Sequence, residues 1–235
     1  MRRPTPPLRV LISAGPTREP IDPVRFISNY STGYMGARLA AEALARGHRV
    51  TVVSGPLTES LPRGARVIPV EQATEMERAL RREAGRADAI IMAAAVSDFR
   101  PFRAASAKVR RRTPFTLQLR ATPDVLSRLP RRSHQLVVGF ALETGRVVVR
   151  AQQKLRAKRL DLLLAQHANG AGAPFGRRKV RAWLLERVRA HSGGRGRRFE
   201  TVTSLGLRSK PDVARVLLDK IEALWYGQHR SGAKA

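Results

Sequence analysis

Short runs of apolar residues recur along the chain between polar or glycine-containing segments, and longer segments carry apolar residues at helical spacing. The short runs are typical of buried parallel strands. They lie at residues 10–12, 49–53, 66–70, 89–95, 136–140 and 161–165, with a weaker one at 116–119. Helical spacing predicts helices that begin near 31–33 and 122 and span 73–85, 147–159 and 210–225. This alternation predicts an α/β fold, a Rossmann-like, doubly wound and mostly parallel sheet with helices on both faces.

The last third of the chain changes pattern. Residues 180–188 and 198–202 are predicted to pair as a hairpin around the glycine-rich turn at 193–196. We expect a small C-terminal hairpin or flap over about 166–205, closed by the helix at 210–225. One Rossmann-like domain then spans residues 1–227, and residues 228–235 form a disordered tail.

A long polar loop with three prolines separates the first strand from the first helix. It closes on Ser31, Thr32 and Gly33, where the helix begins. A helix start after a strand and a polar loop offers free N–H groups and a partial positive charge to an anion. The loop is longer than a connection needs, and it holds Arg25 and Asn29, which suit a carboxylate or phosphate and a carbonyl. The sequence therefore predicts the functional site here.

Composition limits the classes of protein that the chain can belong to. The length of 235 residues and the apolar fraction of 43% suit one large domain with a proper core. No run approaches the roughly 18 apolar residues of a membrane helix, and residues 1–9 lack the apolar core of a signal peptide, so we expect a cytoplasmic protein. Zero cysteines exclude disulfides and thiolate chemistry, and the five histidines never occur at metal-ligand spacing.

The formal net charge of +27 is unusual and by itself suggests a polyanionic partner. However, only seven of the 45 basic residues are lysine, and the arginines are spread over almost every segment. Such a skew is typical of codon bias, so a nucleic-acid partner is disfavoured. The seven lysines are informative because they are rare.

Six segments together resemble one enzyme family. Residues 15–36, GPTREPIDPVRFISNYSTGYMG, are similar to the signature of the phosphopantothenoylcysteine synthetases (phosphopantothenate–cysteine ligases), usually written GGTREPIDPVRxISNxSSGKMG. The later segments follow in the family's order: MAAAVSDFRP (92–101), KVRR (108–111), TPDVL (122–126), VGFALET (138–144) and QKLRAKRLDLLLA (153–165). The similarity covers about residues 8–190, and we expect the chain to correspond to the ligase domain alone of the bacterial bifunctional coenzyme A biosynthesis protein.

The resemblance implies a reaction. Phosphopantothenate and cysteine are joined as an amide at the expense of CTP with Mg²⁺. The carboxylate attacks the α-phosphate to give an acyl-cytidylate and pyrophosphate, and the cysteine amine then displaces CMP. The family's substrate site lies near a homodimer interface, so we expect a homodimer. CTP is favoured over ATP by the bacterial-type spelling of the motifs, although both nucleotides occur among relatives.

The resemblance also implies site residues. Arg25, Asn29 and Lys108 match catalytic positions, and Arg25, Asn29, Ser31, Thr32 and Gly33 match substrate-binding ones. The positions that match nucleotide-binding residues are Gly15, Met92, Ala93, Ala94, Asp98, Lys108, Pro123, Asp124, Val125, Leu126, Phe140, Lys154 and Lys158.

Several of these residues also have plain structural interpretations. Asp98 follows a buried strand, where α/β sheets bind ligands, but it also suits a loop cap. Phe140 suits the core, and Lys154 and Lys158 share a helix face of a kind that is usually solvated. The basic loop at 102–114 is either a solvated connection or a lid that carries Lys108 over phosphates.

Two other functions remain open from the sequence. An NAD(P)-dependent oxidoreductase is disfavoured because Gly15-Pro16-Thr17 is not a GxGxxG fingerprint and no acidic residue follows the second strand. A non-catalytic, basic nucleic-acid-binding protein remains the third hypothesis. A family member with reduced activity is a further alternative, because Tyr34 stands where the motif has lysine and residues 165–167 and 174–179 depart from the pattern.

Overall fold

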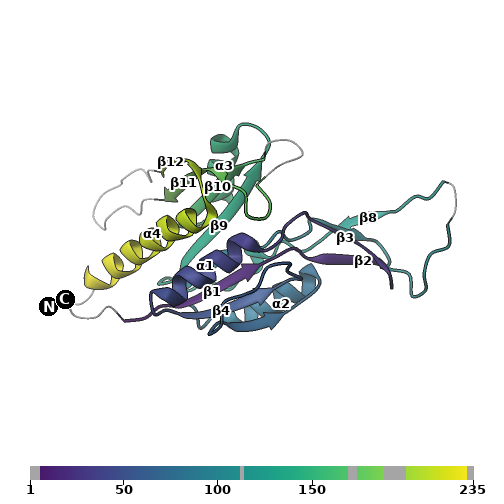
Figure 1. Cartoon of the computed structure of the whole chain (residues 1–235), viewed down its shortest axis with the longest axis horizontal. Coiled ribbons are helices and arrows are strands. Elements are labelled where there is room, and N and C mark those ends of the chain that lie inside the picture. Colours follow the sequence, from purple (N-terminus) through teal and green to yellow (C-terminus); the bar gives the residue numbers. More distant parts are fainter. Residues whose placement is uncertain (1–5, 112–113, 169–173, 188–199, 232–235) are drawn as a thin grey trace.

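The central element is an eight-stranded sheet (Figure 1). The computed structural model describes residues 6–111, 114–168, 174–187 and 200–231. In spatial order the strands are β12 (Glu200–Arg208), β11 (Val180–Arg187), β10 (Leu162–His167), β9 (Leu136–Glu143), β6 (Ala89–Met92), β1 (Arg9–Ala14), β4 (Arg49–Ser54) and β5 (Arg66–Pro69). The six strands from β10 to β5 are parallel, and Ile12 of β1 lies between Ile91 of β6 and Val52 of β4. The predicted mostly parallel sheet is confirmed.

Helices cover both faces of the sheet, as predicted. One face packs against α1 (Tyr34–Ala45) and α4 (Lys210–Ser231), whose Leu39 and Leu217 join Ile12 in one apolar core. The other face packs against α2 (Ala73–Ala84) and α3 (Val147–Ala157), whose Leu80 and Leu155 join Leu11 in a second core. Successive residues of β1 thus serve opposite cores, which is why its sequence is apolar without alternation.

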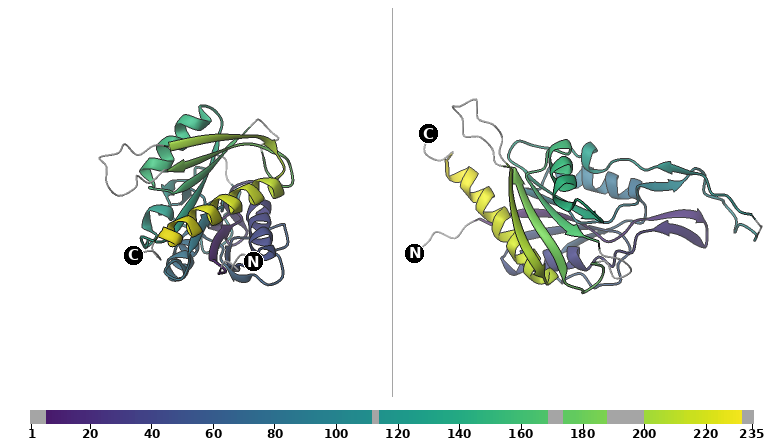
Figure 2. Two further views of the ribbon diagram at one scale, coloured as in Figure 1. Left: turned by 90° about the vertical axis from the view of Figure 1, so that its left-hand side faces the viewer. Right: turned by 90° about the horizontal axis from the view of Figure 1, so that it is seen from above.

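The predicted hairpin is present, but it belongs to the main sheet. β11 pairs antiparallel with both β10 and β12, so the hairpin extends the sheet edge and is not a separate flap. The turn predicted at 193–196 lies outside the described residues. In Figure 2 the two strands lie beside α4, which covers one face of this part of the sheet.

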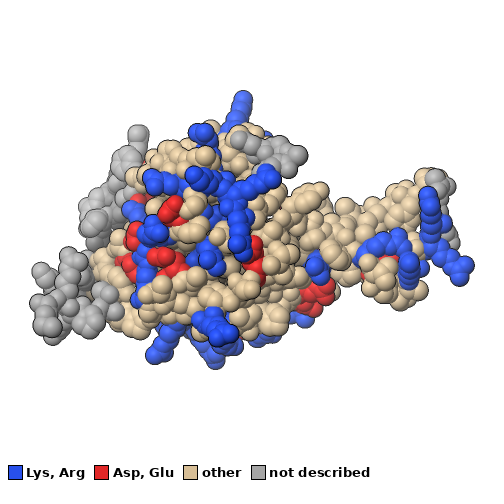
Figure 3. Space-filling view, in the orientation of Figure 1, with Lys and Arg blue, Asp and Glu red and all other residues tan. Residues whose placement is uncertain are grey.

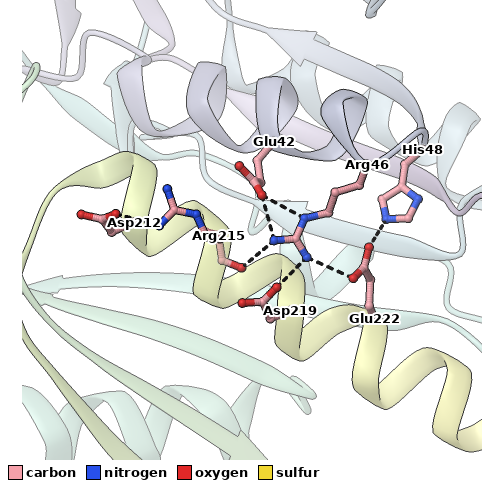
Figure 4. A network of polar contacts seen from close by, with 7 residues as sticks. All are labelled: Glu42, Arg46, His48, Asp212, Arg215, Asp219 and Glu222. Atoms are coloured by element: carbon pink, nitrogen blue, oxygen red, sulfur yellow. Dashed lines mark hydrogen bonds and ion pairs between the residues drawn. The ribbon is translucent and has the colours of Figure 1, made fainter.

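Helix α4 is held against α1 by an ion-pair network (Figure 4). The Arg46 guanidinium donates to Glu42 of its own helix at 2.8 Å and pairs with Asp219 and Glu222 of α4 at 2.7 and 3.0 Å. His48 Nδ1 accepts the Leu8 N–H, so its Nε2 is the donor to Glu222 at 2.8 Å. The network joins the middle of α4 to the C-terminal end of α1.

An arm projects from one end of the sheet (Figures 1 and 2). We use "the arm" for residues 18–28 and 99–121 within the described ranges. It contains two antiparallel strand pairs, β2 (Arg18–Asp22) with β3 (Arg25–Ser28) and β7 (Phe99–Pro101) with β8 (Leu119–Ala121). The sequence predicted a loop in place of the first pair. Pro20 is compatible with a strand there because a two-stranded ribbon leaves one edge of each strand unpaired.

Two further local predictions are wrong. The strand at 89–95 ends at Met92, because the Ala94 N–H donates to the Ser13 hydroxyl at 3.2 Å and Ala95 forms only an isolated bridge with Pro16. The helix expected from Thr122 is only a 3₁₀ turn, Leu126–Arg128: the Thr122 hydroxyl donates to Ser97 O, and Leu129 is extended, as a residue before a proline prefers.

The predicted disordered tail begins too early. Helix α4 continues to Ser231, and the ring of His229 stacks on that of Trp225 with centroids 4.0 Å apart. Residues 232–235 lie outside the described part of the chain. Within that part, none of the helices is both long and apolar enough to cross a membrane.

Basic side chains do not form a single stripe on the face shown in Figure 3. They occur in several groups over the body and along the arm, with acidic side chains between them. This distribution agrees with the spread of arginine along the sequence.

Candidate active site

A cavity of about 480 Å³ lies at the carboxyl edge of the parallel strands. Open α/β sheets bind their ligands at this edge. The walls come from the start of α1, the loop after β6, the segment before η1 (Leu126–Arg128), the later part of β9, helix α3 and the first residue of α4. Its lining includes the predicted residues Ser31, Thr32, Gly33, Met92, Ala93, Ala94, Asp98, Pro123, Asp124, Val125, Leu126, Phe140, Lys154 and Lys158.

Glycines bring the start of α1 close to the sheet. A Cβ on Gly36 would lie 2.5 Å from the Cβ of Ala14, so only glycine allows this approach of α1 to β1. Gly33 has φ +80°, and a Cβ there would lie 2.1 Å from Leu57 Cδ2. Gly15 does not line the cavity, but it has φ +79° and packs beside Gly33.

The start of α1 therefore presents its free end to the cavity. The Gly33 and Tyr34 N–H groups donate to the Ser31 and Thr32 hydroxyls at 3.3 Å each, and Met35 and Gly36 also line the cavity. A helix N-terminus carries a partial positive charge and N–H groups without helical partners. This end of the cavity suits an anionic group.

The opposite wall carries two lysines from α3 and its C-cap. Lys154 Nζ donates to Phe140 O at 2.8 Å, and burial lowers its pKa from the ordinary lysine value. Lys158 pairs with Asp124 and also donates to Ser127 Oγ at 3.0 Å. Burial by itself raises the Asp124 pKa, but hydrogen bonds from Lys158 and Ser127 leave that pKa below its ordinary value. Together these groups make this wall cationic beside the half-buried ring of Phe140.

Asn29 lies at the edge of the cavity. Its amide nitrogen donates to the carbonyl of Ala95, a lining residue, at 2.9 Å. An amide NH₂ has two hydrogens, so one remains for another acceptor.

Arg25 and Lys108 do not line the cavity of their own chain. Both lie on the arm, where Arg25 donates to Val109 O at 2.6 Å and pairs with Asp22 at 3.2 Å. Burial by itself raises the Asp22 pKa, but N–H donors from Val24 and Val109 and the charge of Arg25 leave that pKa lowered. Asp22 thus ties the β2–β3 turn to the segment carrying Lys108, which is exposed.

The sequence analysis missed Lys210, the first residue of α4. Its residue is only 4% exposed, it lines the cavity, and its Nζ donates to Gly176 O at 2.7 Å. Among the described residues no carboxylate forms an ion pair with it. Burial lowers its pKa to about 8, against an opposing effect of Glu59. The sequence could have drawn attention to Lys210 only because lysine is rare in this chain. Its position in the cavity follows from the tertiary fold alone.

Tyr34, which stands where the family motif has lysine, is surrounded by cations. Lys210 Nζ lies 5.9 Å from the ring centroid of Tyr34, and the guanidinium carbons of Arg38 and Arg177 lie 5.2 and 5.7 Å from it. Positive charge is therefore present at the start of α1 although Tyr34 has replaced the motif lysine.

Comparison with known proteins identifies the family. The model of the DNA/pantothenate metabolism flavoprotein C-terminal domain matches residues 7–224. The chain belongs to this family. The resemblance to the phosphopantothenoylcysteine synthetases that the motifs predicted is confirmed at the family level.

Curated relatives support the assignment. The chain is 44% identical over 170 residues to the coenzyme A biosynthesis bifunctional protein CoaBC of Bacillus subtilis, covering 71% of this chain and 42% of that protein. It is 41% identical over 191 residues to CoaBC of Mycobacterium tuberculosis, covering 75% and 46%. A "Cysteine/Cysteine sulfinic acid decarboxylase" from an unknown prokaryotic organism is 38% identical over 220 residues, covering 92% and 58%. The chain thus spans about half the length of the curated relatives it matches.

Solved structures agree on the fold. The crystal structure of the C-terminal domain of a CoaBC protein superposes with a TM-score of 0.74 at 32% identity, covering 94% of this chain and 96% of that one. A Cab2 mutant in complex with phosphopantothenate-cysteine has a TM-score of 0.66 at 20% identity, covering 97% and 89%, and shows likeness of fold alone.

The buried charge of Lys210 predicts a pH dependence of stability. Its folded pKa of about 8 lies below the unfolded value of 10.5, so the unfolded state binds more protons between these two values. The wild-type free energy of unfolding should therefore gain about 2 kcal/mol relative to Lys210→Met between pH 7 and pH 10. Urea unfolding of both proteins at pH 7, 8.5 and 10 measures this difference, in which titrations common to both cancel. A difference independent of pH contradicts a desolvated Lys210.

Proposed function

We propose that the chain is a phosphopantothenate–cysteine ligase of coenzyme A biosynthesis, acting through a CTP-derived acyl-cytidylate. The observation that carries the proposal is the cavity itself, which unites five separate motif segments at the carboxyl edge of the sheet. The kinship with CoaBC proteins and the likeness to a CoaBC C-terminal domain support it.

The wall formed by Phe140, Lys154 and Lys158 suits the nucleotide. The Phe140 ring offers a face for the base, and the two ammonium groups suit a triphosphate. The described residues contain no group of three or more His, Cys, Asp or Glu side chains placed to hold a metal. We therefore assign Mg²⁺ to the CTP co-substrate, since Mg²⁺ is commonly held by phosphates and water with one or two carboxylates. Asp98, which lines the cavity, suits that role.

The end formed by Ser31, Thr32 and Gly33 suits the anionic pantothenate substrate. The helix start supplies N–H donors, and Lys210 supplies a desolvated cation beside them. The second amide hydrogen of Asn29 is directed to the acyl oxygen in our proposal, where it stabilises negative charge as the carbonyl is attacked.

The reaction then needs two displacements. A carboxylate oxygen of phosphopantothenate bonds to the α-phosphorus of CTP, and the bond from that phosphorus to pyrophosphate breaks. The neutral amine of cysteine next bonds to the acyl carbon, the bond from carbon to the CMP oxygen breaks, and the amine loses a proton. Water must be excluded between the steps, because it hydrolyses the mixed anhydride.

We also propose a homodimer in which the arm of one protomer completes the cavity of its partner. Arg25 and Lys108 lie on the arm and outside their own chain's cavity. The arm also carries large apolar residues that are exposed in a single chain: Val24, Phe26, Phe99, Phe102, Phe115 and Leu119. Apolar side chains gathered on one projecting segment are typical of an interface.

A product assay tests the proposed reaction. The chain is incubated with phosphopantothenate, cysteine, Mg²⁺ and either CTP or ATP. We expect phosphopantothenoylcysteine, CMP and pyrophosphate in equal amounts, with CTP preferred. No amide product with either nucleotide contradicts the proposal. Release of CO₂ from cysteine would instead favour the activity named for the decarboxylase relative.

The arm is tested by Lys108→Gln. This change should lower amide formation about 10²-fold, the scale of losing one preorganised charge-stabilising donor. The melting temperature should stay the same because Lys108 is exposed. Arg103→Gln, an exposed residue of the same arm, is the matched control and should retain activity.

Mixing variants decides whether the arm acts on the partner. A dimer of one Lys108→Gln and one Lys158→Gln protomer has one intact site only if Lys108 serves the other chain's cavity. After equal mixing and exchange, about a quarter of wild-type activity should return, because half of the dimers are mixed and each has one intact site. Activity no higher than the sum of the separate variants contradicts action between chains.

A further inference from the structure

A second cavity, of about 520 Å³, lies at the amino end of β9 and β10, away from the carboxyl edge that holds the first cavity. We call it the basic cleft. Its lining residues are Arg131, Arg132, Ser133, Gln135, Val137, Arg159, Asp161 and Arg187. Val137 is the one apolar residue among them, and none is aromatic. Such walls suit a small, strongly charged ligand and not a nucleobase or an apolar group.

The positive charge of the cleft exceeds its negative charge. Four arginines line it, and Asp161 is the one carboxylate in the lining. That carboxylate is already engaged, because Oδ2 accepts the Val137 N–H at 2.9 Å and Oδ1 pairs with Arg187 at 3.1 Å. The Nε of Arg187 is buried and has no hydrogen-bond partner in the described part of the chain. A buried donor of this kind marks the place of an acceptor.

Arg131 adds a second incompletely balanced cation. It donates to three backbone carbonyls, those of Lys158 at 2.7 Å, Arg159 at 3.0 Å and Leu126 at 3.2 Å, and to no carboxylate among the described residues. Burial lowers the pKa of Arg131. Asp161 opposes this shift, whereas the charges of Arg187 and Arg159 add to it. Half-buried cations that crowd one another in this way are stabilised by an added anion.

Capping of α3 accounts for only part of this arrangement. Arg131 meets the carbonyls at the end of α3, and cations are favourable at helix C-termini. Capping leaves Arg132, Arg159 and the buried Nε of Arg187 unexplained. Arg159 moreover has φ +49°, a left-handed conformation that favours glycine, and yet carries a large basic side chain into the cleft lining.

We propose that the basic cleft binds a small phosphate-bearing anion, of the size of inorganic phosphate or pyrophosphate. The site does not depend on the reaction proposed for the first cavity. Its position nevertheless couples the two cavities, because the carbonyls that Arg131 holds belong in part to Leu126 and Lys158, which line the first cavity. An anion that binds Arg131 therefore affects the wall of the first cavity that carries Lys154 and Lys158.

Calorimetric titration of the full chain with sodium pyrophosphate, in a phosphate-free buffer, tests the proposal. The variant Arg132→Gln/Arg159→Gln removes two exposed cleft cations without touching the structural contacts of Arg131 and Arg187. The control Arg78→Gln/Arg82→Gln removes two exposed arginines of α2, so both variants lose the same net charge. We expect the affinity of the cleft to fall at least about tenfold in the first variant and to stay within about twofold in the control.

A third variant distinguishes pyrophosphate binding at the first cavity from binding at the basic cleft. Lys154→Gln/Lys158→Gln should weaken pyrophosphate binding at the lysine-bearing wall of the first cavity and leave the cleft's binding intact. Diffuse attraction of anions to a chain of net charge +27 predicts equal weakening in the cleft variant and the control. That result, or the absence of saturable binding outside the first cavity, overturns the proposal. A single-stranded oligonucleotide that binds with the same dependence on the cleft arginines, when pyrophosphate does not, also overturns it.

Discussion

The contact of Gly36 with Ala14 is the constraint on which the site depends. It lets α1 lie against β1 so closely that any side chain at Gly36 would overlap the strand. Gly33 then turns the chain in a left-handed conformation, so that the helix begins at the carboxyl edge of the sheet. The ion pairs of Arg46 and the apolar residues of α4 hold α4 against α1. The first residue of α4, Lys210, then lies at the end of the cavity where α1 begins. An anion seat made of backbone N–H groups and one buried cation follows from this single close approach.

The division of the functional residues between cavity and arm is the second organising feature. The cavity holds the groups suited to a base, a triphosphate and an anionic substrate, whereas Arg25 and Lys108 lie on a projecting ribbon. There Asp22 pairs with Arg25 and accepts the N–H of Val109, the residue next to Lys108. A charged group on a separate element can approach and leave while the cavity walls stay rigid. This arrangement suits a reaction in which a water-sensitive intermediate must form and then admit a second nucleophile.

The sequence predicted the features that depend on local pattern, and it failed where tertiary contacts decide. The buried strands and the four helices were identified from periodicity. Phe140, Lys154 and Lys158, which the resemblance to the family implied, line the cavity, and their roles stay predictions. The arm was missed because β7 and β8 pair across a long connection. The prediction of a helix from Thr122 was wrong because the Thr122 hydroxyl donates to Ser97 O and does not cap a helix. Lys210 was missed because its neighbours, Tyr34 and Gly176, are distant in sequence.

The fate of the substrate's carboxylate oxygen tests the central claim most directly. Phosphopantothenate labelled with ¹⁸O in its carboxylate is turned over with cysteine and CTP, and the released phosphates are analysed by mass spectrometry. If the carboxylate is activated as an acyl-cytidylate, each CMP carries one labelled oxygen and the pyrophosphate carries none. Label in inorganic phosphate or pyrophosphate, or amide formation that leaves CMP unlabelled, contradicts this account.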